Sequence, residues 1–122
     1  MPLFVLHEHR EHGPTHGDLM LQHGPALVTW RLPAEALRAG PIQHLPAQRL
    51  ADHRSEYLTY EGPVSGGRGE VEAMDRGSYE LISHDDDRWV VELSGQVLRG
   101  RFELTRQHED SWELNQAAGH RS

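Results

Sequence analysis

The sequence predicts an all-β fold, a compact antiparallel β barrel of about eight strands with one short helix. Short stretches rich in β-branched and aromatic residues recur along the chain, turn-forming sequences separate them, and only one segment has the composition of a helix. The chain has 122 residues, of which 36% are hydrophobic, so we expect one domain over residues 1–122. Residues 116–122 contain little apolar surface and are predicted to form a flexible tail.

The first three predicted strands cover residues 3–9, 16–22 and 26–32. The first begins with an apolar run, and a Gly-Pro turn between the second and third predicts a hairpin. Because successive side chains of a strand point to opposite faces, the second strand places His16 and Asp18 on the same face. The sequence therefore predicts a polar face on an otherwise apolar strand.

The only predicted helix covers residues 33–40, where a proline at the first helical position precedes good helix formers and a final glycine. A loop containing Pro41 and Pro46 follows, and a brief strand is predicted over residues 48–50. Residues 62–69 hold four glycines and a proline, which predicts the most mobile loop of the domain.

The second half of the chain reads as a meander of short strands separated by turn signals. The predicted strands cover residues 70–74, 78–83, 88–93, 97–105 and 111–115, and the predicted turns cover residues 75–77, 84–87, 94–96 and 108–110. Trp30, Trp89 and Trp112 all fall in predicted strands, so we expect them to pack in the core rather than to stack on nucleic acid bases.

The charge of the chain restricts the nucleic acids that it could bind. Nineteen acidic residues and 12 basic ones, all of them arginine, give a formal net charge of −7. Proteins that hold duplex DNA gather positive charge on one face, so we expect weak duplex binding, whereas arginine still suits a ligand with few phosphates. No apolar stretch approaches the ~20 residues of a membrane helix and no signal peptide is present, so we expect a cytoplasmic protein.

A metal site is the strongest chemical hypothesis that the residue pattern supports. The chain has no cysteine, so a metal would need histidine and carboxylate ligands. His16 and Asp18 share a strand face, and we choose His9 as a third ligand because the first strand could run beside the second in a barrel. Two histidines and a carboxylate suit manganese, iron or zinc. An ordinary exposed surface pair is the alternative interpretation.

A second candidate group is formed by His53 and Tyr57. A histidine can hold or protonate a phosphate oxygen near neutral pH, and a tyrosine hydroxyl can donate a hydrogen bond to another oxygen. We therefore name both as candidate catalytic residues. The alternative is a loop histidine beside a packed tyrosine.

Several motifs, taken in order, carry a resemblance to a known family. They are Phe4-Val5 with His9, His16-Gly17-Asp18, Thr29-Trp30 with Pro33, Asp52-His53 with Tyr57, Glu61-Gly62, Asp75-Arg76-Gly77, Gly100-Arg101-Phe102 and Trp112. Over residues 4–115 the chain resembles the 3′-phosphoesterase domain of bacterial DNA ligase D and its free-standing relatives. The resemblance implies an eight-stranded barrel that binds Mn2+ through His9, His16 and Asp18. It also implies removal of a 3′-terminal ribonucleotide and then of the 3′-phosphate from DNA 3′ ends.

The chain departs from the family at two positions that the resemblance assigns to phosphate binding. Met20 stands where the family has an arginine that grips phosphate, and Ala34 stands where it has a lysine. Arg10, Arg31 and Arg54 are candidates to replace the lost contact. The spacing before His16 is one residue longer than in the family, which leaves His7 and His12 as alternatives to His9.

Three functions follow from these observations. The first is a metal-dependent DNA 3′-end-processing phosphoesterase that uses Mn2+, with Zn2+ or another divalent transition metal as alternatives, and that acts with a separate ligase or polymerase. The second is a weakened or inactive relative that serves as a metal-binding or nucleic-acid-end-binding module in DNA repair. The third is an unrelated cupin-like metal enzyme, which only the histidine and carboxylate set supports.

Overall fold

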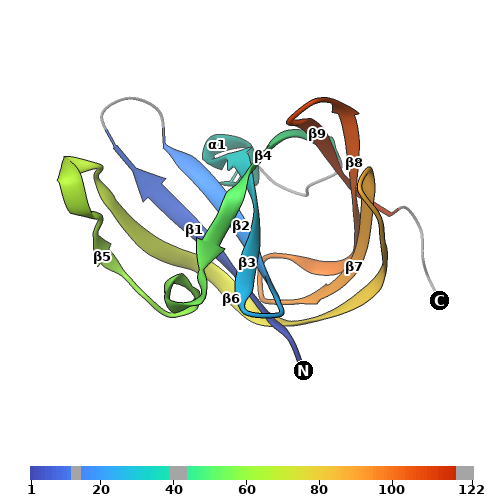
Figure 1. Cartoon of the computed structure of the whole chain (residues 1–122), viewed down its shortest axis with the longest axis horizontal. Helices are drawn as coiled ribbons and strands as arrows, with labels where there is room; N and C mark the ends of the chain where they lie inside the picture. Colours follow the sequence, from blue (N-terminus) through green and yellow to red (C-terminus); the bar gives the residue numbers. More distant parts are fainter. Residues whose placement is uncertain (12–14, 39–43, 118–122) are drawn as a thin grey trace.

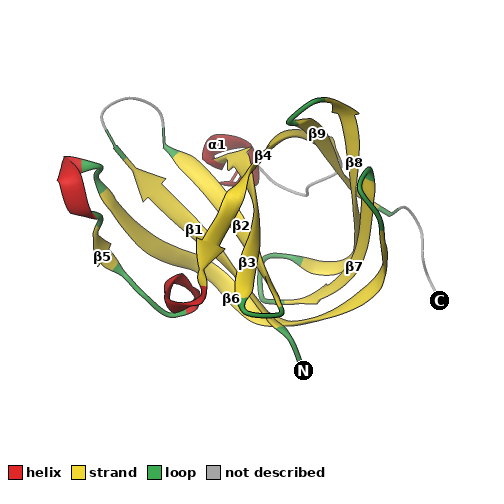
Figure 2. Cartoon of the chain, in the orientation of Figure 1, coloured by secondary structure: helices red, strands yellow, loops and turns green. Residues whose placement is uncertain are grey.

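The computed structural model describes residues 1–11, 15–38 and 44–117. These residues form nine strands, one short α-helix and two 3₁₀ turns (Figure 2). The strands are β1 (Leu3–Arg10), β2 (His16–His23), β3 (Ala26–Pro33), β4 (His44–Arg54), β5 (Gly62–Pro63), β6 (Glu70–His84), β7 (Arg88–Ser94), β8 (Arg99–His108) and β9 (Ser111–Gln116). The helix is α1 (Ala34–Arg38), and the 3₁₀ turns are η1 (Ser55–Leu58) and η2 (Ser65–Gly67).

The strands form one closed antiparallel barrel. Hydrogen-bonded neighbours follow the order β1-β2-β3-β4-β9-β8-β7-β6, and a further pairing of β1 with β6 closes the ring. The two-residue strand β5 adds to β6 outside this ring (Figure 1). The prediction of an all-β antiparallel barrel is confirmed. No helix in the described part of the chain is long and apolar enough to cross a membrane.

Strand β6 closes the barrel because it pairs with different partners along its length. Its first part pairs with β1 and its second part pairs with β7. The predicted turn at residues 75–77 is therefore wrong, because these residues continue one 15-residue strand. The residue types that indicated a turn serve other purposes here. Gly77 leaves room for the carbonyl oxygen of Ser94, which would lie 2.3 Å from an added Cβ, and Asp75 turns its carboxylate to a neighbouring loop.

Strand β4 is longer than predicted, with 11 residues in place of a brief strand. Pro46, which was expected in a loop, lies within it opposite Glu113 of β9. The pairing of β4 with β3 extends only to Gln48, so at Pro46 the strand has one neighbour, and a residue without an N–H is tolerated. The helix is shorter than predicted because Pro33 is the last residue of β3; residues 39–40 lie outside the described residues.

The glycine-rich segment at residues 62–69 also contains regular structure. It holds β5 and η2, and the N–H of Val64 donates a hydrogen bond to the carbonyl of Gly69. At the other end of the chain, Gln116 belongs to β9 and the N–H of Ala117 donates to the carbonyl of Arg101. The prediction of a tail from residue 116 is therefore wrong for Gln116 and Ala117, and residues 118–122 lie outside the described residues.

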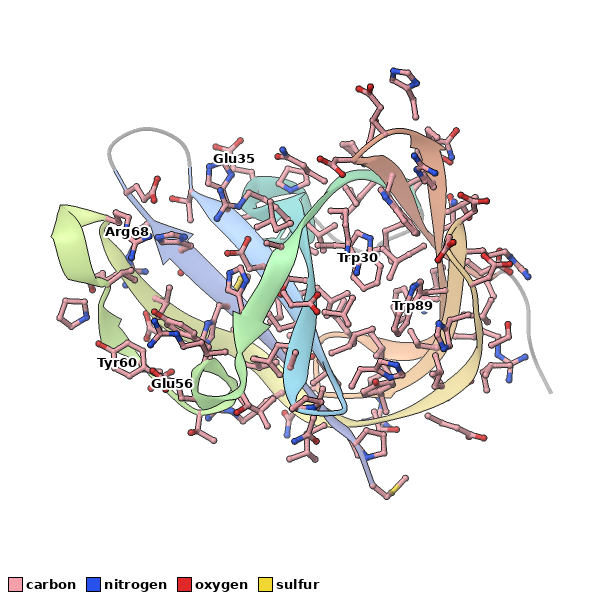
Figure 3. All side chains as sticks on the ribbon, viewed as in Figure 1. Trp30, Glu35, Glu56, Tyr60, Arg68 and Trp89 are labelled. Carbon is pink, nitrogen blue, oxygen red and sulfur yellow. The ribbon has the colours of Figure 1, made fainter. Side chains whose placement is uncertain are left out.

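The main core fills the barrel and is organised around tryptophan. Trp30 makes edge-to-face contacts with Trp89 and Trp112, at ring-centroid distances of 5.4 and 5.5 Å. Figure 3 shows Trp30 and Trp89 within the barrel, away from Arg68 and Tyr60 on the other side of the molecule. All three tryptophans are buried, so their prediction as core residues is confirmed.

The same strands bury a second, smaller set of side chains on their opposite face. Phe4 and Leu6 of β1 belong to the main core, whereas Val5 packs with Met20 and Leu27 in a separate cluster. The 3₁₀ turn η1 covers this cluster through Tyr57 and Leu58. The outer face of β1, β2 and β3 is therefore buried as well, and alternation along these strands directs their polar residues toward it.

Glycine between His16 and Asp18 fixes how the helix packs on β2. A Cβ at Gly17 would lie 2.7 Å from Cδ1 of Leu37, a buried residue of α1. The missing side chain therefore allows α1 to approach the inner side of β2. Because side chains alternate along a strand, the neighbours His16 and Asp18 face outward, away from α1.

Candidate active site

A cavity of about 450 Å³ lies on the outer face of the barrel. Its lining comes from β1 to β4, from Glu11 directly after β1, from the 3₁₀ turn η1, from the segment between β5 and β6, and from the start of β6. It contains histidines, carboxylates and arginines, among them His7, His9, Asp18, Arg31, His53 and Arg68. The cavity therefore joins the two groups of candidate residues that the sequence indicated separately.

Asp18 is the most buried carboxylate of this cavity, with 3% of its surface exposed. Arg31 lies opposite Asp18 in the register of β2 and β3. Its Nε donates to Oδ1 of Asp18 at 2.9 Å and its Nη2 donates to Oδ2 at 3.1 Å, which forms a bidentate ion pair. These hydrogen bonds raise the pKa of Arg31, against the effect of its partial burial, so its guanidinium stays charged.

His9 lies beside this pair and uses both of its ring nitrogens. Its Nε2 is 2.8 Å from the carbonyl oxygen of Arg68 and 3.3 Å from the Glu11 carboxylate. Because a carbonyl oxygen only accepts hydrogen bonds, Nε2 must carry the hydrogen. Nη2 of Arg31 then donates to Nδ1 at 3.3 Å. The Nδ1 atom of His9 is also 3.8 Å from Oδ2 of Asp18, so the structure brings together these two predicted ligands.

His16, the remaining predicted ligand, lies next to the cavity rather than in its lining. It is opposite His9 in the register of β1 and β2, and opposed side chains of an antiparallel pair lie on one face. His12, one alternative to His9, lies outside the described residues. Within the described parts of the chain, no three histidine, aspartate or glutamate side chains are arranged to hold a metal ion.

His7, which the sequence left as an alternative to His9 as a metal ligand, also lines the cavity. It lies opposite Asp18 in the register of β1 and β2 and is 1% exposed. Burial lowers its pKa, although the nearby Asp18 carboxylate acts in the other direction. Its Nε2 is buried and has no hydrogen-bond partner among the described residues. A neutral imidazole with a free nitrogen therefore lines the cavity beside the buried carboxylate.

His53 and Tyr57 come from the end of β4 and from η1, and both line the cavity. Their rings are 6.0 Å apart in an edge-to-face arrangement. Nδ1 of His53 is 3.0 Å from the carbonyl oxygen of Ala51 and must donate to it, which leaves Nε2 for a ligand. The alternative of a packed tyrosine also holds in part, because Tyr57 packs against the cluster of Val5, Met20 and Leu27.

Of the residues considered for phosphate binding, some line the cavity and others do not. Met20 lines the same cavity as Asp18, as their shared strand face predicts, but it is 1% exposed. Ala34 is fully buried, and Arg10 pairs with Glu8, Glu70 and Glu72 outside the cavity. Arg31 and Arg54 both line it. The pairing of Arg31 with Asp18 could have been anticipated only from strand register.

A divalent ion fits this site in donor chemistry but not in the present side-chain arrangement. Imidazoles and a carboxylate are suitable ligands, and the buried free Nε2 of His7 is a further nitrogen donor nearby. The guanidinium of Arg31, however, uses both oxygens of Asp18 and the lone pair of His9. An ion at these atoms would have to take the place of the guanidinium.

Comparison with known proteins places the chain in a family. A family model described as DNA Ligase D 3′-phosphoesterase domain matches residues 6–106. That span includes every residue that lines the cavity. No curated protein gives a significant match to the sequence. Since the match covers most of the chain, this barrel belongs to the DNA ligase D 3′-phosphoesterase domain family.

Proposed function

We propose that the protein is a metal-dependent phosphoesterase that removes a 3′-phosphate, and a 3′-terminal ribonucleotide, from DNA ends. The observation that supports this most directly is one cavity that holds His9, Asp18, His53 and Tyr57 in a chain of the 3′-phosphoesterase family. Its volume of about 450 Å³ suits a terminal nucleotide rather than a duplex. The formal charge of −7 agrees with recognition of an end through few phosphates.

The proposed cofactor is Mn2+, with Zn2+ or another divalent transition metal as alternatives. His9, His16 and Asp18 would hold it. When bound, such an ion supplies a Lewis acid for the phosphoryl group and lowers the pKa of a bound water. The remaining chemistry depends on the residues of the chain itself.

His53 is proposed as the group that contacts phosphate and protonates the leaving oxygen. Its Nδ1–H is committed to the Ala51 carbonyl, so Nε2 is the nitrogen that would deliver a proton to the 3′ oxygen. Hydrolysis breaks the bond between phosphorus and that oxygen, adds the water oxygen to phosphorus, and leaves a 3′-hydroxyl. Tyr57 lines the same cavity and is proposed to orient the substrate, and Arg54 brings positive charge to this cavity.

The test is incubation of the purified protein with Mn2+ and a primer-template that carries a 3′-phosphate or a 3′-ribonucleotide, with products separated on a gel. We expect conversion to a 3′-hydroxyl, with a loss of about a hundredfold or more in His53→Ala, since general acid catalysis contributes that much. His108→Ala is the matched control, because His108 is exposed and does not line the cavity. Equal loss in both variants would contradict the proposal.

The metal ligands have a separate test. We expect His16→Ala and Asp18→Ala to abolish Mn2+ binding in calorimetric titration while circular dichroism reports an intact barrel. Wild-type affinity in either variant would exclude that residue as a ligand. The proposed partners are DNA 3′ ends and, in end joining, a separate ligase or polymerase.

The second candidate function is an end-binding module without catalysis. The bidentate pair between Arg31 and Asp18 favours it, because this pair occupies a proposed metal ligand. Fluorescence anisotropy with a labelled primer-template separates the two functions. Binding that requires a 3′-phosphate, without any product in the presence of Mn2+, would support the module over the enzyme.

A further inference from the structure

Arg31 lines the cavity and contacts both of the predicted metal ligands that line it, Asp18 and His9. Its guanidinium donates to both carboxylate oxygens of Asp18 and to Nδ1 of His9. Asp18 is almost fully buried, with 4% of its side chain exposed, whereas a quarter of the Arg31 side chain is exposed. The buried partner is therefore fixed in place, and the cationic partner has an open path toward solvent.

The atoms that Arg31 contacts are those that a divalent ion would use. The Nε2 atom of His9 carries its hydrogen toward the Arg68 carbonyl, so Nδ1 holds the only lone pair of that ring available to a cation. Nη2 of Arg31 takes this lone pair and one oxygen of Asp18 together. No lone pair of His9 therefore remains for an ion while Arg31 keeps this position.

Charge strengthens this exclusion. A divalent ion at Asp18 would lie within a few ångströms of the guanidinium, and like charges at that distance repel strongly in a partly buried site. The cation that is already present also satisfies Asp18, which would otherwise be a buried, unpaired carboxylate. The site is therefore complete with one cation and has no room for two.

We propose that Arg31 is a built-in cation that occupies the position of a divalent metal at Asp18 and His9, so that guanidinium and metal exclude each other. This inference rests on the proposed function, because it concerns the same metal ligands. Metal binding must release Arg31 from Asp18, and the measured affinity for metal is lowered by the stability of that ion pair. Removal of the guanidinium therefore strengthens metal binding.

The experiment is titration of Mn2+ into the metal-free full chain, with free Mn2+ followed by electron paramagnetic resonance. We expect Arg31→Ala to bind one Mn2+ at least tenfold more tightly than the wild type. Arg31→Gln, which keeps much of the aliphatic stem, should show the same gain and decides the matter if Arg31→Ala fails to fold. Arg101→Ala is the control, because Arg101 pairs with Glu92 on the barrel surface outside the cavity.

A combined variant shows where the gained ion binds. In Arg31→Ala combined with Asp18→Asn, the gain should disappear. Unchanged affinity in folded Arg31→Ala or Arg31→Gln, or a gain that survives Asp18→Asn, would overturn the proposal.

These outcomes are independent of catalysis. Tighter Mn2+ binding in the Arg31 variants, together with no cleavage of a 3′-phosphate by the wild type in Mn2+, would support the exclusion and refute the proposed enzyme. Cleavage by the wild type with no change in Mn2+ affinity on loss of Arg31 would do the reverse.

Discussion

Two buried carboxylates in this barrel have similar exposure and different partners. Asp75 is 6% exposed and Asp18 is 3% exposed. Among the described residues, Asp75 accepts hydrogen bonds from backbone N–H groups alone, those of its neighbour Arg76 and of the loop residues Gln96, Val97 and Leu98. Within the same part of the chain, Asp18 accepts hydrogen bonds from one arginine side chain.

The two sets of partners differ in how firmly the chain holds them. Backbone donors are held by the chain itself, so Asp75 cannot change partners unless the loop between β7 and β8 unfolds. Arg31 instead reaches Asp18 through a side chain of which a quarter is exposed, and the exchange proposed above requires only this side chain to move. Asp18 lines the cavity that also contains His9 and His53, and Asp75 does not. The two acids are similarly buried, so burial does not distinguish them, whereas their partners do.

The largest effect on stability should come from Asp75→Ala. This change leaves four backbone donors without their acceptor, and although water can reach some of them, Leu98 is fully buried. We expect the free energy of unfolding to fall by about 3 kcal/mol, as hydrogen bonds to a charged group contribute ~1.5–3 kcal/mol each. Urea titration followed by circular dichroism measures this, with the exposed Asp86→Ala as control. Similar values for both variants would remove the structural role of Asp75.

Asp18→Asn should lower the free energy of unfolding less than Asp75→Ala does, but it should abolish Mn2+ binding. The amide oxygen keeps one acceptor for Arg31, and a quarter of the Arg31 side chain is exposed to water, so we expect the loss of the second hydrogen bond to lower the unfolding free energy by about 1–2 kcal/mol. Mn2+ binding should be abolished, because the carboxylate charge is gone. Urea and calorimetric titrations measure the two effects. A loss of stability as large as that of Asp75→Ala would contradict the distinction between the two acids.

Met20→Arg would add a guanidinium on β2, two residues after Asp18, in addition to that of Arg31 on β3. Met20 is buried at the cavity wall, so the new stem would cover apolar surface and its charged head would extend into the cavity. We expect kcat/KM for a 3′-phosphate primer-template to rise about tenfold at saturating Mn2+, since arginine can pair with two phosphate oxygens.

Met20→Lys is the matched control for this variant, because it adds the charge without the bidentate geometry, and it should gain less. Unchanged or lower activity in folded, metal-bound Met20→Arg would refute the hypothesis that Met20 marks the place of a missing phosphate contact.

Tyr79 extends the comparison to a buried group with a neutral backbone partner, and its effect should be the smallest. Its hydroxyl donates to the carbonyl of Gln22 at 2.6 Å, and burial raises its pKa above the usual value of 10.0. The unfolded chain loses this proton above pH 10, whereas the folded chain keeps it, so stability is fully present below that pH and falls as pH rises through the higher folded pKa.

Tyr79→Phe should lower stability by about 1 kcal/mol at neutral pH and make the decline above pH 10 less steep than in the wild type. Urea midpoints measured between about pH 8 and 11 test both effects, since this range spans the usual tyrosine pKa. A decline of the same steepness in both proteins would assign it to other groups.

Local sequence patterns predicted most of the strands. They failed where the structure of a residue depends on contacts with residues that are distant along the chain. Alternation in residues 16–22 gave the outward face of Asp18 and Met20, and this face is observed. The turn signal at Asp75 was misread because its carboxylate caps a loop more than 20 residues away along the chain. Pro46 was misread because its place in β4 depends on which neighbour is missing. In each case the local sequence was compatible with two structures.

At the site, the residue pattern was enough to predict which side chains share a face, because the period of a strand puts His9 and Asp18 outward wherever β1 and β2 form. The partners of these side chains depend on contacts that are distant along the chain. The register of β3 puts Arg31 opposite Asp18, and the return of the chain before β6 brings the Arg68 carbonyl to His9. Such contacts join residues 13 and 59 positions apart, so they exist only once the barrel has closed and cannot be read from local spacing.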